Sequence, residues 1–286
     1  MPSRPQTDGS IHRRLTERAR LKHGVLSRQD VVACGVSPQT VTRWARIGRL
    51  QMVLPGAFVL PGVPVSWKQR LLCALEWAGP EARISHRSAA ALLELDGFPE
   101  GVIEVTTTLK RKPPDGLVVH RVRRMSPHDS TTVGPIRTST PARIILDLGA
   151  VSSFDKVECA VEDILRRKLS SLAALHWELR TQGGQGVPGS GTMKRLLQVR
   201  PKGYAPTASR LELKIDRVLR SLVLLFYARQ HVIETRLGER RPDFAFPDYK
   251  FAVEGDSYAH HSGRRAWERD NQRDRACAHW TGTSFT

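Results

Sequence analysis

The chain has 286 residues, and its 45 lysine and arginine residues against 28 acidic residues give a net charge of +17. That length allows roughly two or three domains, and a hydrophobic content of 40% suffices for packed cores, which excludes wholesale disorder. So large an excess of cations attracts polyanions, which makes nucleic acid the leading partner and an anionic membrane the second.

Neither a membrane span nor a disulfide framework is visible in the sequence. No run approaches the roughly 18 consecutive apolar residues of a membrane span, and Met1–Arg14 lacks the apolar core of a secretory signal. We therefore expect a cytoplasmic protein without a membrane partner. The four cysteines lie far apart and form no C-x-x-C pair, which predicts reduced, mostly buried thiols and no zinc site.

Residues 1–10 predict a loose polar tail, and residues 11–63 predict short helices followed by a hairpin. The first helix covers residues 12–23. Two β-type runs between residues 50 and 60 are hinged on Pro55-Gly56, as expected of a hairpin. Helix, helix, short turn, helix and hairpin is the order of a winged helix-turn-helix, whose recognition helix enters the major groove of DNA.

The second and third helices begin at serine caps. Ser27 has Asp30 three residues later, as in a capping box, and its helix ends at Gly35. Ser37 caps the third helix, and Pro38 occupies the first helical position, where the missing N–H costs nothing.

The third helix predicts one packing face and one donor face. Steps of about 100° per residue place Gln39, Arg43 and Arg46 on the side that we expect to contact DNA. Two alternatives remain open: a helical bundle whose two arginines are merely solvated, or a winged helix used for protein contact. The opposite, packing face holds Val41, Trp44, Ala45 and Gly48.

This segment resembles the N-terminal winged-helix domain of AbiEi-like antitoxins. The resemblance continues through Ile84–Leu93, with its Ser-His-Arg-Ser-Ala-Ala run, and through Gly134–Arg143. It implies that the first half of the chain binds DNA and that a cognate toxin is a possible protein partner.

Residues 64–152 predict an α/β middle domain. Helices are expected at 67–77 and 88–95, and strands at 102–109 and 117–122, separated by the basic turn 110–116. Thr140 is the expected cap of another helix. The histidines of this region have no partner at metal-site spacing, so a structural or surface role is predicted for His86, His120 and His128.

Residues 153–205 predict a helical segment followed by a glycine-rich linker. One helix is expected over 154–180. In the run 183–191, Gly184, Gly186 and Gly189 formally match a dinucleotide fingerprint, but a helix precedes them and a proline interrupts them, which excludes a Rossmann loop. We therefore expect a flexible linker.

Residues 206–286 contain acidic residues suited to a hard cation. A helix at 209–225, a strand near 232–234 and paired strands at 243–246 and 251–256 are expected. Asp243 and Glu254 would lie side by side on the paired strands, and alternation places Asp256 on the same face as Glu254. Carboxylates gathered at strand ends suit Mg²⁺ or another divalent cation, which polarises a phosphate and activates water.

The same residues resemble the PD-(D/E)XK nucleases, in the branch related to very-short-patch-repair endonucleases. The resemblance implies Asp243 as the central metal ligand, Glu254 as the second and Glu212 as an assistant from the helix. Asp256 stands where the common motif has lysine, and His260 or His261 would transfer a proton. The matching stretches are Ser209–Glu212, Pro242–Ala245, Ala252–Asp256 and Glu268–Asp274.

Each of these residues also has a structural explanation. Glu212 has capping-box spacing from Ser209, Asp243 could cap a turn, and the two histidines could be solvated. Gly255 interrupts the second strand, and the chain stops where the family adds a further strand and helix. A shortened, inactive domain, or a frameshift beyond the last codon, is therefore an alternative expectation.

The sequence as a whole predicts an α+β protein: an N-terminal winged helix-turn-helix, an α/β middle region and a restriction-endonuclease-like domain that lacks its last elements. The leading functional hypothesis is a DNA-binding, magnesium-dependent endonuclease. The alternative is a non-catalytic antitoxin-like regulator with a degenerate nuclease domain. An RNA-directed enzyme also remains open, because nothing in the sequence reads a base or a 2′-hydroxyl.

Overall fold

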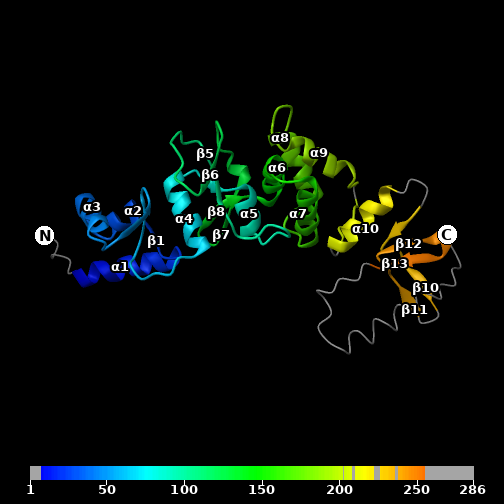
Figure 1. Cartoon of the computed structure of the whole chain (residues 1–286), viewed down its shortest axis with the longest axis horizontal. Helices are drawn as coiled ribbons and strands as arrows, with labels where there is room; N and C mark the ends of the chain where they lie inside the picture. Colours follow the sequence, from blue (N-terminus) through cyan, green and yellow to red (C-terminus); the bar gives the residue numbers. More distant parts are fainter. Residues whose placement is uncertain (1–7, 202, 208–209, 222–225, 236–237, 255–286) are drawn as a thin grey trace. The chain divides into compact units, whose positions relative to one another are not determined.

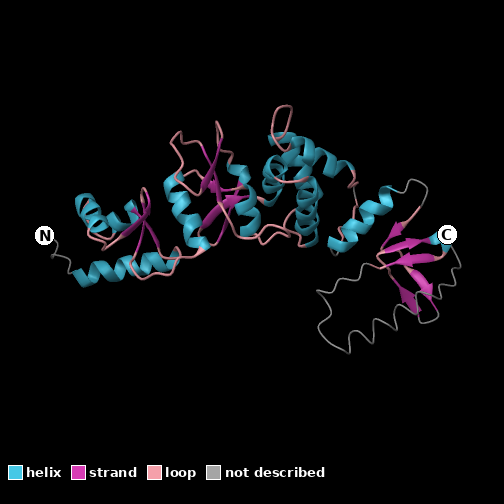
Figure 2. Ribbon diagram, in the orientation of Figure 1, coloured by secondary structure: helices cyan, strands magenta, loops and turns pink. Residues whose placement is uncertain are grey.

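A computed structural model describes residues 8–201, 203–207, 210–221, 226–235 and 238–254. The chain is a mixed α+β protein that divides into two compact units, Met1–Tyr204 and Ala205–Thr286 (Figures 1 and 2). Within the described residues, no helix combines the length and the apolar character needed to cross a bilayer.

The first unit begins with three helices and a small antiparallel sheet, ordered β1-β3-β2. The hairpin hinged on Pro55-Gly56 is confirmed, whereas the short first strand was not predicted. Side chains from the three helices, β1 and β3 form one core, which includes Leu15, Trp44 and Phe58. The elements are α1 (Asp8–Leu21), β1 (Val25–Ser27), α2 (Arg28–Ala33), α3 (Pro38–Arg46), β2 (Gln51–Leu54) and β3 (Ala57–Val59).

The predicted starts of α2 and α3 are confirmed, whereas α1 begins at Asp8, inside the segment expected to be a loose tail and four residues before the predicted start. The Ser27 hydroxyl accepts a hydrogen bond from the Asp30 backbone N–H, and the Asp30 carboxylate accepts one from the Ser27 backbone N–H, so both halves of the capping box are present. Ser37 caps α3 through the Thr40 N–H, and Pro38 is the first helical residue. These signals act within one helical turn, so they are readable without knowledge of the fold.

A five-stranded mixed sheet, ordered β6-β5-β4-β8-β7, forms the centre of the first unit. The strands expected at 102–109 and 117–122 exist as β5 and β6, but they pair in parallel, and the basic segment between them runs the length of the pair instead of forming a hairpin turn. The elements are α4 (Trp67–Ala78), β4 (Arg83–Ile84), α5 (His86–Leu92), β5 (Ile103–Thr107), β6 (Leu117–Arg121), the 3-10 turn Pro127–Asp129, β7 (Ser130–Val133) and β8 (Ile136–Ser139).

Helices α4 and α5 cover opposite faces of this sheet. The Thr107 hydroxyl donates to the carbonyl oxygen of Ala78 at the end of α4, whereas Glu104 and Thr106 contact the start of α5 through Ser88 and Ser85. Because successive strand residues point to opposite faces, the two helices lie on different sides of β5. All five residues of β5 are consequently buried, polar ones included.

Four helices complete the first unit and pack on one another: α6 (Pro141–Val151), α7 (Phe154–Arg166), α8 (Leu172–Gln182) and α9 (Ser190–Gln198). Thr140 caps α6, as predicted. The single helix expected over 154–180 is wrong, because Lys168 adopts a left-handed φ of 55° and ends α7 before Ser171 caps α8. The chain turns there so that both helices pack against α6.

The glycine-rich run 183–191 is packed and does not form the expected flexible linker. Gly189 has a φ of 87°, and a Cβ there would lie 2.0 Å from the carbonyl oxygen of Leu146 in α6. The Ser190 hydroxyl accepts a hydrogen bond from the Gly184 N–H, and α9 begins at Ser190 and buries Met193. Glycine is used here for close backbone approach, a role that composition alone does not distinguish from flexibility.

The second unit has one described helix, α10, next to short antiparallel strands. The strands expected near 232–234 and 243–246 exist as β10 and β12, and β13 covers the first part of the strand expected at 251–256 and ends before Glu254; residues 255–286 lie outside the described residues. Phe244 and Phe246 of β12 form its core with Leu219 of α10. The elements are α10 (Arg210–Ser221), β9 (Ala228–Arg229), β10 (Ile233–Thr235), β11 (Gly238–Arg240), β12 (Phe244–Phe246), the 3-10 turn Pro247–Tyr249 and β13 (Phe251–Val253).

The predicted burial of the cysteines is confirmed for two of the three described ones. Cys34 and Cys73 are buried, Cys159 is partly buried, and all three are free thiols. Burial raises the pKa of the Cys73 thiol to about 12, which keeps it protonated. Cys277 lies outside the described residues.

Candidate functional site

Helix α3 carries the three side chains that the sequence predicts for DNA contact. Gln39, Arg43 and Arg46 are exposed, whereas Val41 and Trp44 are buried in the core beneath them. The polar side chains therefore share the solvent-facing side of an anchored helix. The Arg43 and Arg46 guanidinium groups form no hydrogen bond or ion pair with any described residue.

Gly48 departs from the predicted packing face of this helix. It is exposed, because α3 ends at Arg46 and Gly48 adopts a φ of 77° in the following turn. The helical period does not extend past the helix end. Arg49 follows, and its guanidinium lies over the Trp44 ring, 4.3 Å from the ring centroid.

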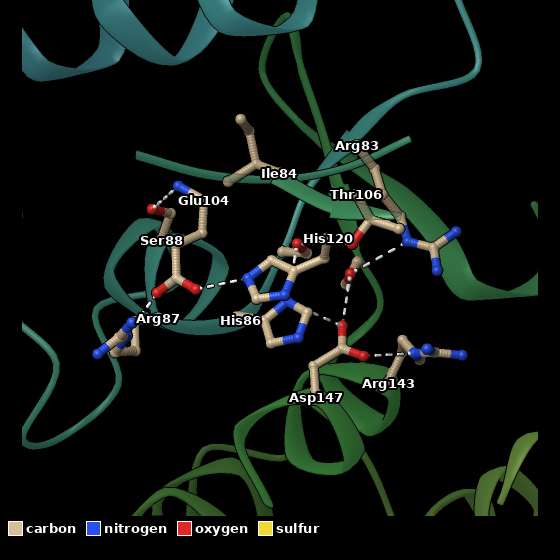
Figure 3. Close-up of polar contacts among 12 residues, drawn as sticks. Arg83, Ile84, His86, Arg87, Ser88, Glu104, Thr106, His120, Arg143 and Asp147 are labelled. Atoms are coloured by element: carbon tan, nitrogen blue, oxygen red, sulfur yellow. Dashed lines mark hydrogen bonds and ion pairs between the residues drawn. The ribbon is translucent and has the colours of Figure 1, made fainter. Parts of the chain in front are cut away.

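A second concentration of polar side chains is buried between α5 and the sheet (Figure 3). The parallel register places Thr106 of β5 beside His120 of β6, and alternation along β5 places Glu104 on the same face. His86, the first residue of α5, reaches this face from the neighbouring helix. We call His86, Glu104 and His120 the histidine cluster.

The histidine cluster is tightly connected. His120 Nε2 lies 2.7 Å from Glu104 Oε2, and Arg87 Nε donates to the other oxygen of Glu104. The His86 and His120 rings are stacked, with centroids 3.4 Å apart and planes within 11° of parallel. One nitrogen or oxygen ligand atom from each of the three residues lies within 4.8 Å of the others.

The surroundings of the cluster set its charge states. Burial lowers the pKa of His86 to about 4, which keeps this imidazole neutral near pH 7. Burial would raise the pKa of Glu104, but the hydrogen bonds from His120 and Arg87 outweigh it and lower the pKa. The cluster therefore combines a neutral imidazole with a carboxylate.

Beside it lies a group of buried acids and arginines, which we call the acid–arginine cluster: Arg83, Asp129, Arg143, Asp147 and Glu178. Arg143 donates to Asp129 at 3.0 Å and to Asp147 at 2.7 Å. Asp147 Oδ2 lies 4.0 Å from His86 Nδ1, so the two clusters adjoin (Figure 3). Three acids here face two guanidinium groups.

An open cavity of about 500 Å³ lies beside the histidine cluster. Glu104 lines it together with Arg87, Ser88, Phe98, Val118 and Lys156. The Glu104 side chain is nevertheless only 1% exposed, so its carboxylate is closed off from the solvent in the cavity.

Of the acidic residues predicted in the second unit, Asp243 and Glu254 flank the strand pair β12 and β13, and Glu212 lies in α10. Phe244 pairs with Val253 and Ala245 with Ala252, so extension of this antiparallel register by one residue sets Asp243 opposite Glu254. Gln230 Nε2 donates to Asp243 Oδ1 at 3.0 Å. Glu212 is buried in the first turn of α10, whereas Glu254 is exposed.

These acids do not converge as closely as the histidine cluster does. Within the described ranges, Glu212, Asp243 and Glu254 do not bring three ligand atoms within 4.8 Å of one another. Asp256, His260 and His261 lie outside the described residues, so their predicted roles stay predictions.

The sequence interpretation missed the histidine cluster. It treated His86 and His120 as isolated, because their ligand spacing along the chain fits no metal motif. Only the pairing of β5 with β6 brings them to Glu104. His128 is exposed and lies edge-on to Trp177, in agreement with its predicted surface role. The available signal was the alternation in β5, which places a charged residue between two apolar ones.

Comparisons with known proteins bear mainly on the beginning of the chain. The crystal structure of the RV2827C protein from Mycobacterium tuberculosis is similar at 18% identity and a TM-score of 0.40, over 71% of this chain and 88% of that one. The comparison with curated proteins found no match. Residues 13–61, from α1 through the hairpin, match the family described as transcriptional regulator, AbiEi antitoxin.

Proposed function

We propose that the chain is a DNA-binding transcriptional regulator of the AbiEi antitoxin type. Residues 8–60 act as a winged helix-turn-helix, with α3 as the recognition helix and the β2–β3 hairpin as the wing. The observation that carries this proposal is the family match over residues 13–61, a segment whose third helix exposes Gln39, Arg43 and Arg46.

The charge of this segment supports the proposal. Residues 8–62 contain nine arginine and lysine residues and three acidic ones, which favours contact with phosphates. Arg43 and Arg46 are suited to guanine edges in the major groove, and Gln39 is suited to adenine. Because no described residue pairs with either arginine, binding DNA would cost no internal ion pair at these positions.

Fluorescence anisotropy with duplexes selected from a random-sequence library tests the proposal. We expect Arg43→Ala and Arg46→Ala each to weaken binding of the selected duplex by about 5- to 150-fold if they contact bases. An arginine that contacts only phosphate would instead weaken all duplexes alike and reduce the salt slope by about 1. Arg123→Ala, which removes an exposed arginine outside this segment, is the matched control.

Equal binding by the two α3 variants and the Arg123 control would contradict the proposal. It would favour a winged helix used for protein contact. The antitoxin description of the family also leads us to propose a toxin protein as a second partner, which co-purification with candidate toxins from the same genome would test.

A second candidate function is metal-dependent hydrolysis of DNA by the second unit. The register that sets Asp243 opposite Glu254 supports it, because two carboxylates on adjacent strands form a donor set that a hard cation prefers. Asp243, Glu254 and, from α10, Glu212 would hold Mg²⁺, which would polarise a phosphate and activate water. Gln230 orients the Asp243 carboxylate through its hydrogen bond.

Incubation of plasmid DNA with the full chain and Mg²⁺ tests this candidate. We expect cleavage that Asp243→Asn abolishes and that Asp248→Asn, at an exposed neighbouring aspartate, leaves intact. Unchanged plasmid with every divalent cation tried would leave the regulator as the function of the whole chain. The same assay on RNA distinguishes an RNA-directed enzyme.

A further inference from the structure

We propose that His86, Glu104 and His120 bind a divalent transition-metal ion, with Zn²⁺ as the best match. This site belongs to the first unit and uses none of the residues proposed above for DNA contact or hydrolysis. It rests on the position of three side chains that come from α5, β5 and β6.

The donor set points to the kind of ion. Two imidazoles and one carboxylate form a borderline nitrogen and oxygen set, which suits Zn²⁺ better than Mg²⁺ or Ca²⁺. The three ligand atoms lie within 4.8 Å of one another, a spread that small side-chain movements reduce to a common coordination sphere. Three protein ligands leave a fourth position for water or a solute.

Neighbouring side chains already orient the ligands. Ser85 is the N-cap of α5, yet its hydroxyl makes no capping bond; it lies 2.9 Å from His86 Nδ1 and accepts from the Thr106 hydroxyl at 2.7 Å. Metal-bound histidines commonly have such a partner on the second nitrogen. Arg87 donates to the Glu104 carboxylate, and the Glu104 backbone N–H donates to the Ser88 hydroxyl.

The backbone of His86 adopts an unusual conformation at the proposed site. Its φ of 51° lies in the left-handed region, which a non-glycine residue occupies at a cost. This conformation places the imidazole over His120 at the first position of α5. Such strain is commonly found at functional sites, where surrounding contacts maintain it.

The cavity supplies a route for the ion. Glu104 and Arg87 both line the cavity of about 500 Å³, and the Glu104 side chain is 1% exposed, so an ion reaches its carboxylate once the Arg87 side chain moves aside. Entry then replaces the direct contact between Glu104 and His120 with two bonds to the ion. Because parallel stacked rings cannot aim nitrogens at one point, binding also tilts one ring and breaks the stack.

Isothermal titration of the metal-free full chain with Zn²⁺, checked by metal analysis after dialysis, tests the site. We expect one tight equivalent in the wild type that is lost in both Glu104→Gln and His120→Ala. His176→Ala, which removes an exposed histidine outside the cluster, should retain it. Ser85→Ala should weaken binding by about 10- to 100-fold, because it removes the partner of His86.

Two further readouts separate a bound site from altered folding. At Zn²⁺ about 100-fold above its Kd, the wild type should melt about 5–10 °C higher, whereas metal-free Glu104→Gln should keep cooperative melting and gain no such shift. The imidazole resonances of His86 and His120 should move together as the stack opens. Equal Zn²⁺ stoichiometry in the wild type and all four variants, or no tight equivalent in the wild type, would overturn the proposal.

Discussion

Two groups of buried charges in the first unit shift the pKa of a carboxyl group in opposite directions. In the N-terminal part, Asp30 accepts hydrogen bonds from Arg18 at 3.0 Å and Lys22 at 2.8 Å, as well as from Ser27. Burial would raise the pKa of Asp30, but the bonds from Lys22 and Ser27 outweigh it and lower the pKa to about 2. This carboxylate is ionised at every physiological pH.

In the acid–arginine cluster, acidic groups outnumber the cations that contact them. Asp129, Asp147 and Glu178 face only two guanidinium groups, and Asp129 Oδ1 and Glu178 Oε1 are buried with no hydrogen-bond partner among the described residues. Burial, with Asp129 nearby, raises the pKa of Glu178 to about 7. Burial acts in the same direction at both places, so the number of cations in contact decides the sign of the shift.

The largest effect should come from removal of a cation from the deficient cluster. Arg83 is 1% exposed and donates to Ser139 and Asp129, so Arg83→Met leaves a buried acid short of its partner. We expect the free energy of unfolding to fall by about 3–5 kcal/mol in urea titrations at pH 7. Arg123→Met, at an exposed position, should change it by less than about 0.5 kcal/mol. If both variants lowered the free energy of unfolding by similarly small amounts, these charges would not stabilise the cluster.

The second prediction concerns the pH dependence of Glu178. Its folded pKa is raised from 4.5 to about 7, so its contribution is fully present below pH 4.5 and is lost as pH rises through 7. Glu178→Gln should remove that slope and stabilise the protein by up to about 3 kcal/mol at pH 8, with little change at pH 4. Parallel stability curves for the two proteins between pH 4 and pH 8 would contradict it.

Asp30 should show the opposite pH dependence with a smaller magnitude. Its folded pKa lies below the ordinary 3.8, so its contribution is present above that pH and is lost as pH falls towards 2. Asp30→Asn should cost about 2 kcal/mol at pH 7 and progressively less in acid. Asp115→Asn, at an exposed aspartate, is the control in the same unfolding series.

The smallest predicted effect separates a buried cap from an exposed one. Ser27→Ala removes a hydroxyl that accepts from the Asp30 N–H and donates to the Asp30 carboxylate, whereas Ser37→Ala removes an exposed cap of α3. Each should cost about 1 kcal/mol, and the buried cap should cost more. Urea unfolding that ranks Ser37→Ala above Ser27→Ala would show that the Asp30 cluster does not depend on its serine.

The N-terminal part was predictable because its signals are local. Ser27 with Asp30, Ser37 with Pro38, and the Pro55-Gly56 hinge each act within a few residues, and all three appear in the structure. The donor face of α3 follows from the helical period alone. The helical period does not predict the position of Gly48, because the helix ends before this residue.

The middle part was predictable only in pieces. The sequence indicated strands near β5 and β6, but it did not predict that they pair in parallel. That pairing depends on how distant segments bury their apolar faces together. The prediction of a flexible linker at Gly183–Gly191 was wrong for a related reason. A glycine that permits close packing against Leu146 and one that permits flexibility have the same composition.

The amino-acid order by itself determined the capped starts of α2 and α3, the exposed arginines of α3 and the strand pair that Asp243 and Glu254 flank, because hydrogen-bonding caps and residue periods operate over a few positions. Tertiary structure alone decided that His86, Glu104 and His120 meet, and that three buried acids share two arginines. The physical reason is burial: residues far apart in the chain meet only when apolar faces leave water, and their charges are then set by the neighbours that they acquire.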